Sequence, residues 1–229
     1  MTRALQAEAP PDDVLLNSLR HGVHNLGLSL NDDQQELLIA YLRLIHKWNH
    51  TFNLTAIREL DRMVGLHVLD SLAVVPYIPT GAILADVGSG AGLPGIPIAI
   101  ARPDVRVTLI DTVAKKATFM QQAVGELRLT NVKVHHARVE SLQLDPLCDI
   151  VISRAFAELK DFAEASAHLL KDGGKLYAMK GVLPHEEMAR LPAQFKVTTT
   201  HPLQVPGVEG QRHLIIMTPS SSPSPDPPA

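Results

Sequence analysis

A group of closely spaced glycines is the part of this sequence best suited to binding a ligand. An apolar run from Ala82 leads to Asp86, and Gly88, Gly90 and Gly92 follow at every second position. Glycine leaves backbone amides uncovered and tolerates positive φ, so a ligand can lie directly against such a turn. The pattern predicts a strand that ends in a nucleotide-binding turn, with a helix directly after it.

Two ligands fit this turn, and two carboxylates bear on the choice. A dinucleotide fold shows Gly-x-Gly-x-x-Gly, present from Gly90 to Gly95, and an acid about 20 residues later for the ribose, where Asp111 stands. Asp86 would repel a pyrophosphate but suits a cation. S-adenosylmethionine carries a sulfonium, an ammonium and a ribose, and no phosphate. The acids therefore favour this methyl donor over NAD or FAD, with Asp86 organising the loop and Asp111 binding the ribose.

Composition narrows the class of protein. The 229 residues are 45% hydrophobic and 20% charged, enough for one core with a small appended element. There is no long apolar run and no charged-then-apolar leader, so we expect a soluble cytoplasmic protein. The net charge of −3 argues against a surface that is basic throughout, but it permits a local basic face. The single cysteine, Cys148, lies in an apolar run and is expected to be a buried, inert thiol.

The hydrophobic pattern divides the chain into an all-helical part and an α/β part. Residues 1–11 and 219–229 are rich in Pro, Ser and Ala and are predicted to be disordered. Helical spacing predicts an N-terminal helical subdomain over residues 12–78, with helices at 12–26, 32–48 and 59–75. Asn31 is the expected cap of the second helix.

From residue 79 to 218 the pattern alternates between strands and helices. Short apolar runs predict strands at 105–110, 132–135, 149–152 and 175–179, with helices at 96–101, 115–127 and 156–170 between them. Alternation of this kind requires a parallel sheet with helices on both faces. The last two runs, 195–201 and 213–218, have no helix between them and predict an antiparallel hairpin. The whole arrangement resembles the seven-stranded, Rossmann-like sheet of class I S-adenosylmethionine-dependent methyltransferases, in which ligands lie beyond the carboxyl ends of the strands.

Several short motifs together resemble one family, the glucose-inhibited division protein B family of bacterial 16S ribosomal RNA guanine-N7 methyltransferases. The resemblance runs from about Leu30 to Thr218. The motifs are Lys47-Trp48-Asn49 with Asn53-Leu54-Thr55, His67-Val68-Leu69-Asp70-Ser71, the glycine-rich segment 86–95, Ser153-Arg154-Ala155-Phe156 and Lys180-Gly181. The resemblance implies methylation of N7 of the guanine at position 527, in the 530 loop of 16S rRNA, with S-adenosylmethionine as cofactor. It also implies that the donor is bound by Gly88, Leu93, Val139, Glu140 and Arg154.

The expected chemistry needs little from the protein beyond positioning. Guanine N7 has a free lone pair, so its attack on the sulfonium methyl requires no general base, and catalysis rests on alignment of the reacting atoms. Enzymes that methylate exocyclic amines usually show Asn/Asp-Pro-Pro-Tyr/Phe after the fourth strand, whereas this chain has Ser153-Arg154. Arg154 is the expected catalytic residue, in contact with the donor carboxylate, with guanine O6 alone or with a phosphate. The alternative is an ion pair with a neighbouring acid such as Glu158.

Four residues are candidates for contact with RNA: Phe52, Asn53, His67 and Lys180. His67 and Asp70 share a helix face, which indicates either a local His–Asp bond or the border of the cleft; two such ligands do not make a metal site. Trp48 belongs to an apolar stripe, whereas Phe52, expected in the following loop, is free to stack on a base. Lys180 is expected to meet a phosphate or to end its strand in solvent.

Three hypotheses remain open at this point. The first is the ribosomal RNA methyltransferase, expected to act as a monomer on 16S rRNA or the small ribosomal subunit, with no membrane and no metal. The second is a small-molecule methyltransferase on the same fold. The third is a non-enzymatic module that binds a dinucleotide.

Overall fold

The computed structural model describes residues 10–154 and 156–220. Most of the two ends predicted to be disordered therefore lies outside the described residues, as does Ala155. Two residues of those ends belong to regular structure: Pro11 is the N-cap of the first helix, and Pro219 is the last residue of the last strand.

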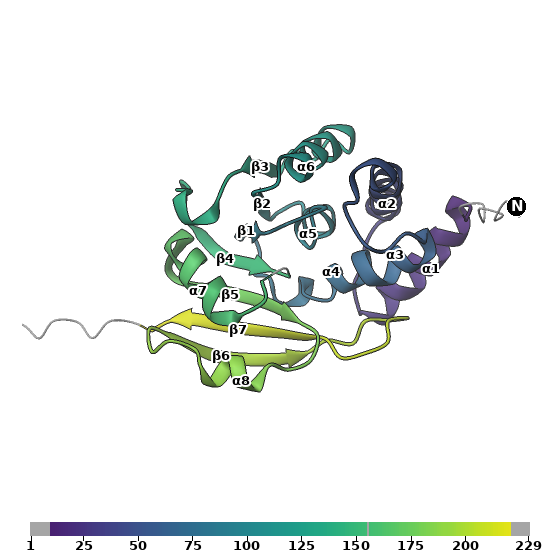
Figure 1. Cartoon of the computed structure of the whole chain (residues 1–229). Helices are drawn as coiled ribbons and strands as arrows, with labels where there is room; N and C mark the ends of the chain where they lie inside the picture. Colours follow the sequence, from purple (N-terminus) through teal and green to yellow (C-terminus); the bar gives the residue numbers. More distant parts are fainter. Residues whose placement is uncertain (1–9, 155, 221–229) are drawn as a thin grey trace, which may run out of the picture.

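A seven-stranded sheet in the order β3-β2-β1-β4-β5-β7-β6 forms the centre of the molecule (Figure 1). Its strands are β1 (Ile83–Val87), β2 (Arg106–Asp111), β3 (Val132–His136), β4 (Cys148–Ser153), β5 (Leu170–Lys180), β6 (Phe195–Pro202) and β7 (His213–Pro219). The first five strands pair in parallel, and β7 lies antiparallel between β5 and β6. The predicted parallel sheet with a terminal antiparallel hairpin is confirmed.

Helices cover the two faces of this sheet, as Figure 1 shows. On one face lie α1 (Asp12–Asn25), α2 (Asp32–Phe52), α5 (Gly95–Ala101) and α6 (Ala114–Glu126), and α7 (Leu159–Ser166) covers the other. Successive residues of β1 alternate between the two cores, because Leu84 packs with the first group and Ala85 with α7. Since α1 and α2 share one buried core with the sheet, the predicted subdomain border near residue 78 remains a prediction.

The second helix is longer than predicted. Asn31 caps it as expected, since Asn31 Oδ1 accepts the Gln34 backbone N–H at 2.8 Å. The helix continues to Phe52 and ends at Asn53, whose φ of 48° is the left-handed conformation that closes many helices. Phe52 is therefore the last residue of α2 and not part of a loop, and its ring stacks on Trp48, with centroids 5.1 Å apart.

The third predicted helix is present, but its hydrogen-bonding pattern changes from α-helical to π-helical and back. It comprises α3 (Leu60–Met63), the π-helical segment η1 (Val64–Leu69) and α4 (Asp70–Leu72), followed by the 3-10 turn η2 (Val75–Tyr77). π-helical turns are rare and frequently occur at functional sites. Apolar spacing predicts a helix here, but it does not distinguish a π-helical turn from an α-helical one.

Two further differences lie in the second half of the chain. The predicted helix 156–170 is shorter: α7 is followed by the 3-10 turn η4 (Ala167–Leu169), and β5 begins at Leu170 because this residue pairs with Cys148. The short helix α8 (His185–Ala189) was not predicted. Cys148 is buried as expected, and burial raises the pKa of its thiol to about 11.

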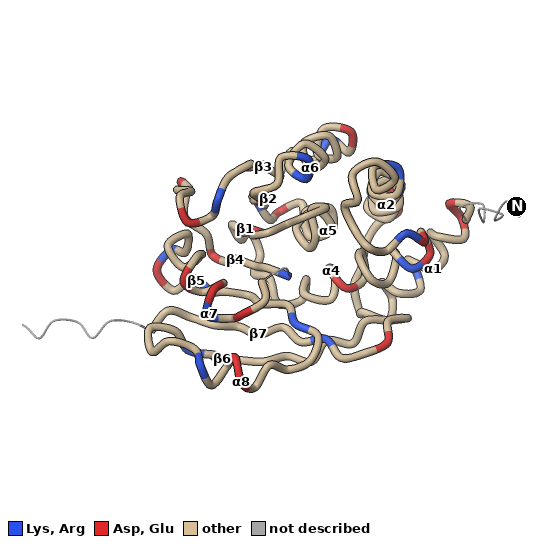
Figure 2. The backbone as a smooth tube through the Cα atoms, in the orientation of Figure 1, with Lys and Arg blue, Asp and Glu red and all other residues tan. Residues whose placement is uncertain are grey.

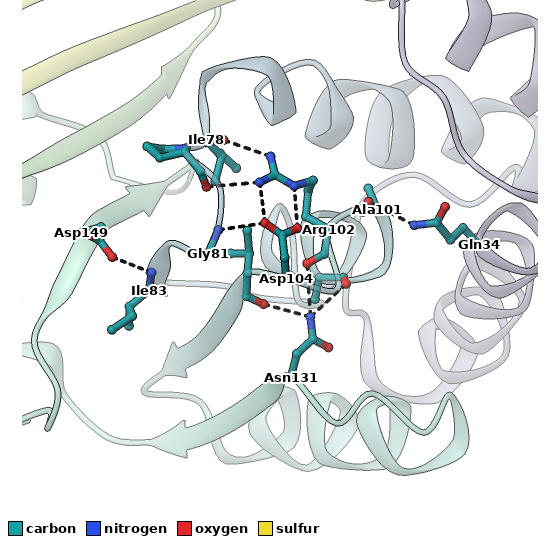
Figure 3. A network of polar contacts seen from close by, with 12 residues as sticks. Gln34, Ile78, Gly81, Ile83, Ala101, Arg102, Asp104, Asn131 and Asp149 are labelled. Carbon is teal, nitrogen blue, oxygen red and sulfur yellow. Dashed lines mark hydrogen bonds and ion pairs between the residues drawn. The ribbon is translucent and has the colours of Figure 1, made fainter.

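Polar contacts hold together the edge of the sheet at which the parallel strands begin (Figure 3). Arg102 donates from Nε and Nη2 to both carboxylate oxygens of Asp104, at 2.8 and 2.7 Å. Its Nη1 donates to Ile78 O at 2.9 Å and its Nη2 to Pro79 O at 3.2 Å. The Gly81 amide donates to Asp104 at 2.8 Å. These contacts tie the segments that lead into β1 and β2 together.

The same edge continues along β3 and β4. Asn131, directly before β3, donates from Nδ2 to Ala99 O at 3.0 Å and to Val105 O at 2.9 Å. Asp149, at the start of β4, accepts the Ile83 amide at 2.7 Å. We call Gly81, Arg102, Asp104, Asn131 and Asp149 the amino-edge network, because each stands before or at the start of a parallel strand.

Candidate functional site

The glycine turn has the predicted geometry. Gly88, Gly90 and Gly92 have φ values of 72°, 61° and 86°, a region that side-chain-bearing residues rarely adopt. A Cβ on Gly92 would lie 2.5 Å from Ile96 Cδ1, so a side chain there would also force Ile96 of α5 to shift. The Tyr41 hydroxyl of α2 donates to Ala91 O at 2.5 Å and fixes the turn from the helical side.

Asp86 lies beneath this turn and is fully buried. Its Oδ2 accepts the Gly95 amide at 2.8 Å, so the carboxyl group anchors the start of α5. Its Oδ1 is buried and has no hydrogen-bond partner in the described part of the chain. Burial raises the pKa of Asp86 to about 7. The carboxyl group is thus not a full negative charge at neutral pH, and the expected repulsion of a pyrophosphate is weaker than the sequence suggested.

Asp111 is the last residue of β2 and supports the turn from the side. Its Oδ2 accepts the Gly90 amide and its Oδ1 the Val113 amide, both at 2.8 Å. The side chain thus sets the conformation of the turn, and its contact with a ribose remains a prediction.

A cleft of about 460 Å³ opens beside the turn, and we call it the glycine-loop cleft. It brings together four of the residues predicted to bind the donor: Gly88, Asp111, Val139 and Glu140. Asp86, Gly90, Leu93 and Arg154 are not among its lining residues; Leu93 is 4% exposed and packs in the core.

A second cleft, of about 450 Å³, lies next to the first, and we call it the arginine cleft. The polar side chains that line it are His67, Asp70, Arg154, Lys180, Arg212 and His213. Arg154 lines this cleft and Phe156, two residues later, lines the glycine-loop cleft, so the clefts are neighbours. Figure 2 shows a basic segment directly after β4 and an acidic segment at α4 on the same side of the sheet.

Arg154 forms an ion pair, but not with the predicted acid. Its Nη1 lies 3.1 Å from Asp70 Oδ2 and also donates to Leu66 O at 3.2 Å. Glu158 instead pairs with Arg190, at 3.9 Å. Asp70 is the first residue of α4, and a contact across 84 positions cannot be found from local spacing.

His67 is buried in the wall of the arginine cleft. Its Nε2 lies 2.9 Å from Thr55 Oγ1, and this contact takes the place of the predicted His–Asp bond. Burial, with a further contribution from the nearby Arg154, lowers the pKa of His67 to about 4. The imidazole is therefore neutral at physiological pH.

The Lys180 side chain does not end in solvent, because its ammonium group bonds to the protein. Its Nζ donates to Phe156 O at 3.2 Å, to Ala157 O and to Glu187 Oε2, where the distance is 2.9 Å. All three N–H groups thus have protein partners, and the side chain pins the segment that follows β4. Contact between Lys180 and RNA remains a prediction.

Phe52 and Asn53 lie at the C-terminal end of α2. Neither residue is among the described residues that line the two clefts. Trp48 packs between Phe52 and Phe119, with the two aromatic rings of Trp48 and Phe119 5.6 Å apart, as expected for a residue on an apolar stripe. An RNA contact by Phe52 requires a base to stack beside Trp48.

Two polar side chains of the arginine cleft, Arg212 and His213, were not predicted from the sequence. Nε of Arg212 donates to Asp70 Oδ1 at 3.2 Å. The residue stands directly before β7, and β7 pairs antiparallel to β5 with His213 opposite Lys180. The predicted hairpin could have indicated Arg212. An antiparallel strand begins at the edge of the sheet where the parallel strands end, so the residue before it lies near the cleft.

Two absences apply to residues 10–154 and 156–220. No group of three or more His, Cys, Asp and Glu side chains there is arranged to hold a metal ion. No helix in that part of the chain has the length and apolar character to cross a membrane.

The strand order, the glycine turn and the cleft at the carboxyl ends of the strands define a class, the Rossmann-like methyltransferase fold. The crystal structure of a ribosomal protein L11 methylase from Lactobacillus delbrueckii subsp. bulgaricus is similar, with a TM-score of 0.51 at 15% identity. The match covers 66% of this chain and 76% of that one.

Sequence comparison then gives the family. The family model described as rRNA small subunit methyltransferase G matches residues 34–215. The chain is 53% identical over 199 residues to ribosomal RNA small subunit methyltransferase G of Azoarcus sp. and 52% identical over 204 residues to that of Aromatoleum aromaticum. Each match covers 87% of this chain, and 94% and 97% of the two relatives respectively. The chain therefore belongs to the rRNA small subunit methyltransferase G family, and the predicted family resemblance is confirmed.

Proposed function

We propose that this chain transfers the methyl group of S-adenosylmethionine to N7 of a guanine in 16S rRNA, at position 527 in the 530 loop. The observation that carries the proposal is the family match over residues 34–215, together with relatives of about half identical sequence over nearly their whole length. The alternatives, a small-molecule methyltransferase and a dinucleotide-binding module, have no observation of their own in their favour.

The glycine-loop cleft has the chemistry to hold the donor. Gly88 offers uncovered backbone, Asp111 and Glu140 offer carboxylates for hydroxyl groups, and Val139 offers an apolar surface. The unpartnered Oδ1 of Asp86 lies under the same turn, where a nearby cation would favour the ionised carboxyl group. When bound, the donor supplies an electrophilic methyl group on a sulfonium.

The chain's own contribution to the reaction is positioning. The nucleophile is a ring nitrogen with a free lone pair, so no side chain must remove a proton from it. Because the pKa of His67 is lowered to about 4, its imidazole is a weak base, and its Nε2 already contacts Thr55, which agrees with a site that has no general base. We assign to Arg154 the catalytic role of aligning the substrate at the border of the two clefts, where misplacement by about 1 Å costs roughly a hundredfold in rate.

The remaining roles belong to the same proposal. Gly90 and Leu93 shape the turn that receives the donor, and Phe52, Asn53, His67 and Lys180 are candidates for the RNA side of the complex. We propose a monomer that works in the cytoplasm, where its ribosomal substrate is assembled.

The test compares substrates and ligands. Purified protein is titrated with S-adenosylhomocysteine and with NAD, and methyl transfer is measured to small-subunit particles, naked 16S rRNA and free guanosine. We expect S-adenosylhomocysteine to bind and 16S rRNA, free or in particles, to accept the methyl group. Efficient methylation of free guanosine would favour the small-molecule enzyme, and binding of NAD alone would favour the dinucleotide module.

A further inference from the structure

One side chain from the helical part of the chain reaches the glycine turn. Tyr41 lies in the middle of α2 and is fully buried, and its hydroxyl donates to Ala91 O at 2.5 Å. The hydroxyl lies against the turn itself, since a Cβ on Gly92 would be 3.4 Å from it. Burial raises the pKa of Tyr41 well above its usual range, so the hydroxyl keeps its proton and remains a donor at physiological pH.

The tip of the turn does not fix its own conformation. Ala91 stands between Gly90 and Gly92, which have little intrinsic preference for one sign of φ. The two amides that follow Ala91 bond Ser89 O, both at 2.8 Å. Among the residues that the structure describes, the Ala91 amide has no acceptor, and the Tyr41 hydroxyl is the one donor to Ala91 O. The direction of this carbonyl therefore depends on α2.

A second side chain of α2 gives Tyr41 a fixed place. Gln34 lies seven residues earlier, on the same face of the helix, and donates from Nε2 to Ile100 O at 2.9 Å and to Ala101 O at 3.1 Å. Both carbonyls are at the end of α5, whereas Ala91 lies shortly before its start. The helix α2 is thus attached at both ends of α5, which holds the tyrosine hydroxyl at a constant position relative to the turn.

We propose that Tyr41 is a positioning residue for the methyl donor, and that it holds the glycine turn in the conformation that receives S-adenosylmethionine without touching the donor itself. The proposal rests on the function proposed above and extends donor binding to a residue outside the glycine-loop cleft. Tyr41 is not among the residues that line that cleft, so its effect on affinity passes through the turn. A turn with a preset conformation loses less affinity to backbone ordering when the donor binds.

Loss of the hydroxyl leaves a buried acceptor without a partner. Ala91 is only 4% exposed, so its carbonyl has little access to water in the observed conformation. Buried acceptors without a donor are unfavourable, and the glycines on either side give the peptide group freedom to rotate. The ligand-free turn then populates other conformations. The apparent donor affinity falls in proportion to the fraction of molecules that keep the binding conformation.

The first test is Tyr41→Phe, which keeps the buried ring and removes only the hydroxyl. The affinity for S-adenosylhomocysteine is measured by calorimetry, and we expect it to weaken about tenfold, the effect of one hydrogen bond. KM for S-adenosylmethionine should rise by a similar factor, whereas KM for 16S rRNA and kcat at saturating donor should stay at the wild-type values. A residue that aligned the substrate in the transition state would instead lower kcat.

Tyr177→Phe is the matched control. Tyr177 of β5 is 3% exposed, and its hydroxyl donates to Tyr77 O at 2.8 Å, so it makes the same kind of bond to a backbone carbonyl. Neither of these two residues lines the glycine-loop cleft or the arginine cleft. Both variants should lower the melting temperature of the ligand-free protein by about 2–4 °C, but only Tyr41→Phe should weaken donor binding. Equal weakening in both variants would overturn the proposal, because the effect would then be a general loss of stability.

Hydrogen exchange tests the turn in the wild type as well. If Tyr41 holds the turn, the Gly92 and Leu93 amides are protected in the ligand-free protein, and S-adenosylhomocysteine adds little protection. In Tyr41→Phe the same amides should exchange faster until the ligand is added. Unprotected exchange of these amides in the ligand-free wild type would overturn the proposal, even if Tyr41→Phe does not fold.

The results separate this proposal from the proposed function. If the wild type binds S-adenosylhomocysteine and methylates 16S rRNA but Tyr41→Phe retains the wild-type donor affinity, the role of Tyr41 is wrong and the proposed function stands. If the wild type neither binds S-adenosylhomocysteine nor transfers a methyl group, the proposed function fails, and the role of Tyr41 in donor binding fails with it.

Discussion

The two edges of the sheet each hold an Arg–Asp pair, and the pairs differ in how many guanidinium donors have a protein acceptor. At the amino edge, Arg102 has protein acceptors for Nε, Nη1 and Nη2, and Asp104 takes a further amide. At the carboxyl edge, Arg154 has partners only at Nη1 among the described residues. The same two residue types therefore stabilise the fold where each guanidinium nitrogen has an acceptor, and they leave donors free for a ligand at the carboxyl edge.

The titration of the carboxyl groups shows the same contrast. Hydrogen bonds from the Arg102 side chain hold the pKa of Asp104 well below its usual range, so the fold favours the charged form. Burial raises the pKa of Asp86 to about 7, so the fold disfavours the charged form under the glycine turn. The charged form of Asp104 therefore stabilises the amino edge, whereas ionisation of Asp86 under the glycine turn lowers the stability of the fold at neutral pH.

The largest effect that can test this contrast is the pH dependence of stability from Asp86. Its folded pKa of about 7 lies above the ordinary value of 3.8, so its contribution is fully present below about pH 4 and is lost as the pH rises through 7. Relative to Asp86→Asn, the free energy of unfolding of the wild type should fall by about 4 kcal/mol over that range. Urea denaturation at several pH values measures it.

Asp104→Asn is the matched counterpart from the amino edge. Because the folded pKa of Asp104 is lowered, its contribution is present above the ordinary pKa and is lost as the pH falls. The two variants should therefore differ from the wild type with opposite pH slopes. A pH-independent difference between the wild type and Asp86→Asn would show that Asp86 is not protonated in the folded chain.

The second prediction concerns activity. Arg154→Ala should reduce methyl transfer to 16S rRNA about a hundredfold, because a positioning contact is lost, and should leave the melting temperature nearly unchanged. Arg102→Ala should do the reverse, with a lower melting temperature and normal activity per folded molecule. Full activity in Arg154→Ala would remove this residue from the site.

The smallest effect is expected from Asn131, the member of the amino-edge network with an uncharged polar side chain. Asn131→Ala leaves Ala99 O and Val105 O without their donor and should cost about 1–2 kcal/mol of unfolding free energy with no change in KM for RNA. Thr130→Ala, at the exposed neighbouring position, is the control. A change in RNA affinity in Asn131→Ala would mean that the two edges are not independent.

The sequence predicted the features that follow from local chemistry. Gly88, Gly90 and Gly92 require positive φ, and Asn31 has the side chain of a helix cap, so both were assigned correctly. The strand alternation and the helix-free final segment were sufficient for the topology. The comparisons support the family that the motifs indicated.

The hydrogen-bond and ion-pair partners of the site residues could not be predicted from neighbouring residues in the sequence. Glu158 was named as the alternative partner of Arg154, yet the acid that pairs with Arg154 is Asp70. Lys180 was expected at a phosphate or in solvent, and in the structure its ammonium group bonds two backbone carbonyls and Glu187. Such partners depend on how the π-helical segment and the hairpin are placed on the sheet. Long side chains reach several acceptors, and only the three-dimensional arrangement decides which is nearest.

The direction of β7 has a practical consequence for experiments. The strand begins beside Lys180, at the edge that holds both clefts, and runs to the opposite edge, where the Ser220 amide bonds Gln194 O at 2.8 Å. A purification tag or surface linker joined beyond Ser220 thus starts at the far side of the sheet from both clefts (Figure 1). Immobilisation through that end should therefore leave both clefts accessible to RNA.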